Sequence, residues 1–193
     1  GLGANATGFY SYGMTVINDG SIEVSATAAA IGGRIYGLPE FDNAGDIRAT
    51  GATATGLYAS ATSLTNDGHI VAEGTSATGV IVDYYYGASV TNTGSIQVDG
   101  GSAGATGLYA TTLLSFDNSG SIVVTDSEKD VTTVAVRFAD QQNGVQTFDN
   151  SGLIQGGYAF QEFNPNGSYY SYDFAQALTN SGQILGKIDL GYG

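Results

Sequence analysis

Cysteine is absent from this 193-residue chain, so neither a disulfide framework nor thiol chemistry is available to it. Proline occurs only twice and charged residues make up 12% of the chain, a composition that does not suit a helical protein. Disorder is also disfavoured, because 42% of the residues are hydrophobic. No run of about 18 apolar residues is present, so the sequence predicts no membrane-spanning helix. Thirty glycines instead favour many short strands joined by turns.

Basic residues are scarce as well. Five Lys and Arg stand against 18 Asp and Glu, which gives a formal net charge of −13. A field of this sign repels phosphate backbones, so the sequence predicts no nucleic-acid partner. Cations, basic proteins and neutral glycans remain open as partners.

What the sequence does contain is a repeat, which decides the fold. The phrase Asn-x-Gly-x-Ile occurs seven times, and an apolar residue stands two places before every Asn. The seven asparagines are Asn18, Asn43, Asn66, Asn92, Asn118, Asn150 and Asn180. A second phrase, Ala-Thr-Gly followed by an apolar residue and Tyr, falls between them, for example at residues 54–58 and 105–109. Each repeat is a unit of two or three short strands that can bury its apolar residues only by stacking on the next unit.

Alternation predicts strands after both phrases. The residues four and six places beyond each motif Asn are apolar or small, whereas the residue between them varies, as expected of a half-buried strand. In the second phrase we expect an inward row formed by Phe9, Ile35, Leu57, Val80, Leu108 and Val134. The positions that follow would form an outward stacked ladder of Tyr10, Tyr36, Tyr58, Ile81 and Tyr109.

The Asn-x-Gly phrase predicts a sharp corner between strands, because Asn and Gly both tolerate positive φ. In a stacked coil each motif Asn would lie about 4.8 Å from the next, so that the side-chain amides form a ladder. The sequence therefore predicts an all-β fold, a single-stranded right-handed parallel β-helix of about seven coils and roughly 34 Å in length. Residues 1–193 would form one such domain or a segment of a longer β-helix.

Together the two phrases resemble the repeats of bacterial autotransporter passenger domains and related β-helical surface adhesins. The likeness extends along nearly all of residues 1–193. The resemblance implies a right-handed β-helix exported to the bacterial cell surface, associated with the outer membrane and acting in adhesion, aggregation or biofilm. The chain begins and ends in mid-repeat, so we expect a segment of a longer chain or coils completed by a neighbouring copy.

The repeat spacing is interrupted near residues 83–88, 137–147 and 160–177, where insertions would project from one corner of the coil. The candidate ligand- or partner-binding residues are the aromatic side chains of these insertions: Tyr84, Tyr85, Tyr86, Phe163, Tyr169, Tyr170, Tyr172 and Phe174. Such rings stack on sugars or anchor a protein partner. Alternatively, they pack down as a local cap over the backbone of their own loop.

Chemistry in the sequence is sparse. Asp126, Glu128 and Asp130 are weak candidates for a calcium site, but the turn lacks the Gly and late Glu of an EF-hand loop, and a solvated turn is the alternative. No other cofactor is predicted. The single histidine, His69, stands at a variable position of the motif, so we expect a solvated turn residue rather than a base. No Ser/His/Asp constellation can be assembled beyond it.

These observations predict a non-enzymatic extracellular structural or adhesive module, a rigid rod that stacks end to end into fibres. Its aromatic loops would contact a host or neighbouring cell, a glycan or a protein. The alternative is a polysaccharide-degrading lyase or glycosidase on the same scaffold, which needs two convergent carboxylates or acidic calcium ligands with a base. A third function, an ice- or mineral-binding face, needs an outward row of threonines, which we do not expect here.

Overall fold

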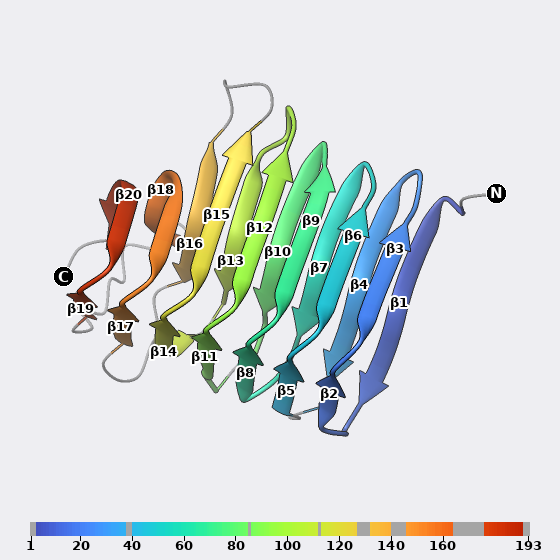
Figure 1. The fold of residues 1–193 in the computed structure, drawn as a ribbon, viewed down its shortest axis with the longest axis horizontal. Coiled ribbons are helices and arrows are strands. Elements are labelled where there is room, and N and C mark those ends of the chain that lie inside the picture. The colour runs from blue at the N-terminus through green and yellow to red at the C-terminus, as the bar shows by residue number, and fades with distance from the viewer. Residues whose placement is uncertain are drawn as a thin grey trace.

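The computed structural model describes residues 3–37, 40–84, 86–111, 113–126, 132–139, 146–163 and 176–190. Every regular element in these segments is a β-strand, and the strands stack in parallel as a solenoid, which confirms the predicted fold class (Figure 1). About six turns separate the first motif Asn from the last. Within these segments no helix is long and apolar enough to cross a membrane. The right-handed sense of the coil stays a prediction.

Each turn contributes strands to three faces of the solenoid. The first face contains the Ala-Thr-Gly phrase and is formed by β1 (Asn5–Tyr12), β4 (Ala29–Tyr36), β7 (Thr53–Ala59), β10 (Ser76–Val82), β13 (Ala105–Ala110), β16 (Thr133–Ala139) and the second half of β18 (Leu153–Phe163). The second face ends at the motif Asn and is formed by β2 (Val16–Asn18), β5 (Glu40–Asn43), β8 (Ser63–Asn66), β11 (Ala88–Asn92), β14 (Leu113–Asn118), β17 (Gln146–Asn150) and β19 (Gln176–Asn180). The third face follows the motif Gly and is formed by β3 (Ser21–Ser25), β6 (Asp46–Thr50), β9 (His69–Gly74), β12 (Ser95–Gly100), β15 (Ser121–Asp126), the first half of β18 and β20 (Gln183–Asp189).

The first and third faces merge at the C-terminal end. Residues 153–155 of β18 pair with β15, whereas residues 158–163 pair with β16, so this strand passes from one face to the other. The two faces therefore count as one 13-stranded sheet beside the 7-stranded sheet of the second face. Of the predicted insertions, residues 137–139 belong to β16, 146–147 to β17, 160–163 to β18 and 176–177 to β19, while residues 140–145 and 164–175 lie outside the described segments.

One apolar core runs along the inside of the solenoid. The isoleucines of the third face and the apolar residues two places before each motif Asn on the second face both point into it, as the alternation predicts. In the C-terminal layers the core is aromatic, since the ring of Phe148 lies 4.8 Å from that of Phe138 and 5.6 Å from that of Phe160, measured between centroids. Phe160 is thus a core residue, although the sequence places it in an insertion.

Side chains on the first face do not alternate regularly between the core and the surface, because glycines interrupt the pattern. Ala54 and Leu57 are three residues apart, yet both are buried in the core. Between them the strand changes phase at Gly56, where an added Cβ would overlap the carbonyl of Gly79 in the next layer and the side chain of Ile70. This close approach is what requires glycine in the Ala-Thr-Gly phrase.

The register assumed for the predicted inward residues is therefore wrong at two positions. Phe9 pairs with Gly33 rather than Ile35, and Leu108 pairs with Val136 rather than Val134. Ile35 is still buried in the core, but Val134 is buried outside the core cluster. Both errors come from degenerate copies of the phrase, in which Gly32 and Ala135 occupy the place of the phrase glycine and shift the phase.

A row of threonines occurs on the first face, but it is not exposed throughout, since Thr55 is buried. Thr55, Thr78 and Thr106 are register partners in successive layers of the first face. Thr7 belongs to the same row, with Ile31 between it and Thr55. Ile31 interrupts the row between Thr7 and Thr55, and Val134 occupies the next position after Thr106. Hydroxyl groups are therefore not present in every layer of the row.

The motif asparagines form a continuous ladder at the corner between the second and third faces. Six successive bonds, each 2.7 Å long, run from the Nδ2 of one Asn to the Oδ1 of the Asn in the next layer. Asn66, Asn92 and Asn118 are completely buried. The second N–H of an Asn reaches a carbonyl of its own turn, as from Asn43 to Gly45 at 3.0 Å. Each interior amide is thus satisfied within the stack.

The motif glycines serve a different purpose from the one expected. The described glycines with positive φ are Gly13, Gly37, Gly87, Gly104 and Gly186, so the motif glycines do not supply it. Instead, a Cβ added to Gly120 would overlap the carbonyl oxygen of Gly94, which accepts a 2.9 Å hydrogen bond from the Ser121 amide. Stacking, rather than turn conformation, requires glycine at this corner.

Candidate functional site

The first insertion contains one ring that packs inward and one that is exposed. Tyr84 packs against the core, whereas Tyr86 is 76% exposed and its ring makes an edge contact with that of Tyr84 at 5.8 Å. Gly87, at φ +93°, closes the turn by donating its amide to the Tyr84 carbonyl. The same loop thus holds one ring against the core and one ring at the surface.

The remaining predicted aromatic residues are only partly described. Phe163 ends β18, and its ring lies 6.4 Å from that of Tyr109 in β13. Five of the predicted residues lie outside the described segments: Tyr85, Tyr169, Tyr170, Tyr172 and Phe174. Of the predicted aromatic residues that the structure describes, only Phe163 is thus brought to the outer side of the first face.

A row of aromatic and basic side chains follows the outer side of the first face. We call it the outer row, and its register partners in successive layers are Tyr10, Arg34, Tyr58, Ile81, Tyr109, Arg137 and Gln161. Tyr36 lies two residues beyond Arg34, yet its ring reaches between Tyr10 and Tyr58, at centroid distances of 5.6 and 5.3 Å. The ladder expected from the sequence is thus present, with Arg34 in the register position assigned to Tyr36.

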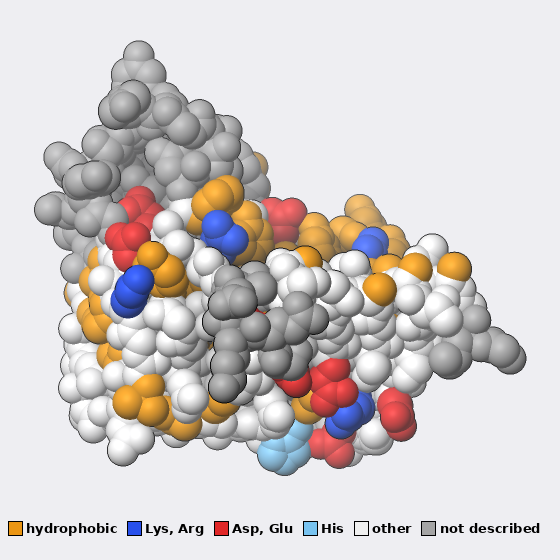
Figure 2. All heavy atoms as spheres, turned by 90° about the horizontal axis from the view of Figure 1, so that it is seen from above, with side chains coloured by type: hydrophobic (Ala, Val, Ile, Leu, Met, Phe, Trp, Pro, Cys, Tyr) orange, Lys and Arg blue, Asp and Glu red, His pale blue; other side chains and the backbone are white. Residues whose placement is uncertain are grey.

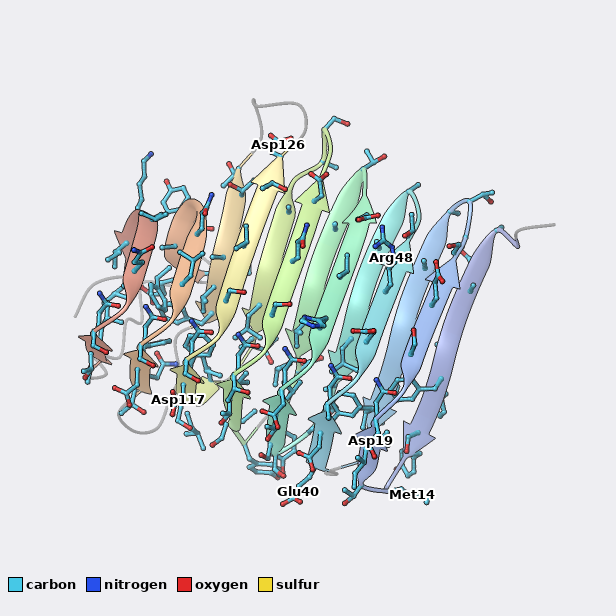
Figure 3. The ribbon with its side chains drawn as sticks, viewed as in Figure 1. Met14, Asp19, Glu40, Arg48, Asp117 and Asp126 are labelled. Atoms are coloured by element: carbon cyan, nitrogen blue, oxygen red, sulfur yellow. The ribbon has the colours of Figure 1, made fainter. Side chains whose placement is uncertain are left out.

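The described basic residues are unevenly distributed. Arg48, on the third face, donates from its Nη2 to both carboxylate oxygens of Glu73 at 2.7 Å (Figure 3). Arg34 and Arg137 instead lie over the rings of Tyr58 and Phe163, at 5.7 and 4.4 Å from the centroids. The buried Nε of each has no hydrogen-bond partner among the described residues. The outer row thus holds cations that contact rings, as Lys187 of β20 also does over the ring of Tyr158 at 5.1 Å.

Two opposite sides of the surface differ accordingly. Figure 2 shows many hydrophobic side chains, with basic and acidic ones among them, along one side, and acidic and basic side chains grouped near the single histidine along the other. That histidine, His69, is exposed at the start of β9, and its Nδ1 lies 2.7 Å from the Ser95 hydroxyl. It makes a surface contact with a neighbouring layer, as expected of a solvated position.

Tyr58 is held in an acidic environment at the centre of the outer row. Its hydroxyl donates a 2.9 Å hydrogen bond to Asp83, which also accepts one from Thr111 at 2.9 Å. Partial burial, followed by the hydrogen bond and the charge of Asp83, raises the pKa of Tyr58 to about 12. The phenol is therefore a protonated donor across the physiological range, and not a base.

A hollow of about 510 Å³ opens beside Arg137 on the first face. Its polar lining is formed by Ser76, Thr78, Thr106, Thr132, Arg137 and Gln161. These residues come from β10, β13, β16 and β18 and from the residue preceding β16. No acidic residue is among the described residues that line it. Hydroxyl groups, an amide and one guanidinium thus meet at one concave place.

Sequence reasoning missed this hollow. Arg137 occupies the position that Tyr58 and Tyr109 hold in other layers, and aligning Ala135 with the phrase glycine would have revealed that exchange. The concavity itself depends on the small residues Ala103 and Gly104, which the chain places between β12 and β13. No repeated phrase marks them.

The weak calcium candidates are not brought together as a described site. Asp126 ends β15 (Figure 3), and Glu128 and Asp130 lie outside the described residues. No group of three or more His, Cys, Asp or Glu side chains with metal-binding spacing occurs among the residues that the structure describes. In comparisons with protein-family models, with curated proteins and with solved structures, nothing matches the chain.

Proposed function

We propose that the chain is a non-enzymatic structural and adhesive module of a bacterial cell surface, a rigid rod that displays side chains and stacks end to end. The observation that carries this proposal is the unbroken ladder of six Nδ2-to-Oδ1 bonds at the corner of the solenoid. It couples every layer to the next, and in the interior layers the coupled polar groups are completely buried, which penalises local opening of the rod there. The resemblance of the repeats to autotransporter passengers supports the extracellular setting.

The two ends of the described stack support end-to-end association. Core positions are left open in both end layers, since Val16 and Ile22 in the first layer and Leu178 in the last are only partly buried. Ile188, which pairs with the buried Phe160, is 49% exposed. The outermost described strands at both ends also have one edge without a strand partner among the described residues. Such edges accept a further strand from another chain.

The polarity of the ladder makes the two ends complementary. Each Asn donates its Nδ2 toward the C-terminal end, so Asn18 presents its Oδ1 at one end and Asn180 its Nδ2 at the other. Two copies would therefore associate head to tail. Such contacts do not close into a ring and so generate fibres. A coil from a longer polypeptide would use the same contacts.

Gly20 provides a direct test. A Cβ at each later motif glycine would overlap the preceding layer, whereas one at Gly20 meets nothing within 4 Å. Gly20→Ala should therefore leave the fold unchanged but place a methyl group where the partner's Gly182 carbonyl must lie. We expect fibres of the unchanged chain in electron micrographs at about 0.15 M salt, where charge repulsion is screened. We expect only short rods for Gly20→Ala.

Ser21→Ala, in the same layer with its side chain exposed, is the matched control and should form fibres like the unchanged chain. Equal fibre formation by Gly20→Ala, or monodisperse rods of the unchanged chain at high concentration, would contradict the stacking proposal. Release of shortened or unsaturated sugars from polysaccharides would contradict the non-enzymatic part and favour the lyase or glycosidase alternative.

A further inference from the structure

We infer that the hollow beside Arg137 binds a short acidic sugar through the carboxylate of that sugar. This inference rests on the adhesive role proposed above and names the ligand class for one site on the rod. The hollow, of about 510 Å³, falls within the range of ordinary small-ligand sites, roughly 300–1,000 Å³.

The charge of the hollow selects an anion. The chain as a whole carries a formal charge of −13, so its long-range field opposes anions, and binding of an acidic sugar must come from local contacts in the hollow. Among the described lining residues Arg137 is the one charged side chain. Its Nε is buried without a described hydrogen-bond partner, and its guanidinium carbon is stacked 4.4 Å from the centroid of the Phe163 ring. A guanidinium fixed in this way is prepared for a paired interaction with a carboxylate.

The rest of the lining selects a sugar rather than a bare anion. Thr78 and Thr106 are register partners in adjacent layers, so their hydroxyl groups repeat at the strand spacing, about 4.8 Å. Gln161, the register partner of Arg137, adds an amide that both donates and accepts. Both threonines stand three residues before the register position of Arg137, so a sugar whose carboxylate meets Arg137 would extend along the hollow toward hydroxyl groups on two layers. Uronic acid sugars combine these groups on one ring.

The test uses oligogalacturonate, a chain of uronic acid sugars, and its methyl ester, which keeps the hydroxyl groups and loses the charge. Calorimetry should show binding of oligogalacturonate to the unchanged chain and binding of the ester about tenfold or more weaker. Arg137→Gln should weaken binding of the acid by about tenfold or more and leave binding of the ester unchanged. Arg48→Gln is the matched control on the third face and should bind the acid like the unchanged chain.

Thr78→Val provides a second variant, because it keeps the shape of a β-branched residue on β10 and removes one hydroxyl group. It should weaken binding of the acid by about twofold to tenfold. Circular dichroism and the thermal midpoint verify that each variant is folded.

The possible results separate this inference from the proposed function. Absence of acid binding, equal binding of the ester, or an equal loss in Arg48→Gln would overturn the assignment of the hollow. The rod and its fibres would then still stand on the Gly20→Ala experiment. Cleavage of the bound oligogalacturonate, lost in Arg137→Gln, would instead overturn the non-enzymatic proposal while keeping the site.

Discussion

The Asn corner and the outer row of the first face have the same period but differ in how strictly they repeat. All seven layers have Asn and Gly at the corner, whereas the outer row contains Tyr, Arg, Ile and Gln. At the corner each side chain is enclosed by identical neighbours, so any change leaves an unpaired buried group. On the outer row the side chains touch their neighbours but also meet solvent. Variation there costs little, and this is where a rod can carry binding chemistry.

The largest effect is expected where the corner backbone is closest. Gly120→Ala would place a methyl group against the carbonyl of Gly94, and both belong to stacked backbone that cannot move aside in one layer alone. We expect a loss of about 4 kcal/mol or more in the free energy of unfolding, in the upper range for single substitutions, or a failure to fold. Denaturant unfolding followed by circular dichroism measures it.

Gly20→Ala is the control for this substitution, because the residue type and the motif position are the same and only the preceding layer differs. We expect a change within about 0.5 kcal/mol in the monomeric rod. If both variants lost the same stability, the glycine would be required by its own turn and not by stacking.

The Asn ladder is expected to give the next largest effect. Asn118→Ala removes the acceptor of Asn92 Nδ2 and the donor to Asn150 Oδ1, both at 2.7 Å. Two polar groups would then be left in a dry interior, which costs about 1–3 kcal/mol for each group that finds no substitute partner. We expect a fall of about 2–4 kcal/mol in the free energy of unfolding.

Asn180→Ala makes the same change at the exposed end of the ladder, where solvent replaces the lost partner. We expect it to cost about 1 kcal/mol or less. A folded Asn118→Ala chain of unchanged stability that had lost a ligand would show that the corner is a binding site, contrary to its structural role.

These differences explain which features of the structure could be predicted from the sequence. The corner was predictable because its physical requirement is identical in every layer and therefore appears as a repeated phrase. The chemical reason for the glycine was not, since positive φ and close stacking both select Gly and only the positions of Gly94 and Gly120 distinguish them.

The candidate site was less predictable for a related reason. A hollow arises where the repeat is broken, and a broken repeat gives no phrase from which register can be counted. The phase errors at Ile35 and Val134 show this, because both follow degenerate copies of the Ala-Thr-Gly phrase. Arg137 lay in the same segment, so its place beside Phe163 could be found only from the strand pairing.

A smaller effect is expected for Tyr58, within the outer row. Its pKa is about 12 in the folded chain and about 10 in an unfolded one, so folding favours the protonated phenol. The resulting stabilisation is complete below pH 10 and is lost as the pH rises from about 10 to 12. Solvent reduces its size because the side chain is only partly buried. As the pH rises from about 10 to 12, the free energy of unfolding should therefore fall less for Tyr58→Phe than for the unchanged chain.

Phenolate absorbance identifies the group. Subtracting the titration of Tyr58→Phe from that of the unchanged chain should isolate one transition near pH 12. Asp83→Asn should move this transition to lower pH, because it removes the charge and weakens the hydrogen bond that favour the protonated form. A transition near pH 10 that Asp83→Asn leaves unchanged would show that the contact between Tyr58 and Asp83 does not stabilise the protonated phenol.

The smallest effect is expected for the ion pair between Arg48 and Glu73, which also joins adjacent layers. The bond lengths of 2.7 Å equal those of the Asn ladder, but the side chains are 47% and 34% exposed. Water solvates both ions when the pair is broken, so Arg48→Gln should cost less than about 1 kcal/mol, and less again in high salt. A double-mutant cycle with Glu73→Gln isolates the pair. A coupling energy as large as the Asn118 effect would show that connection between layers, rather than burial, sets the strength of a contact in this solenoid.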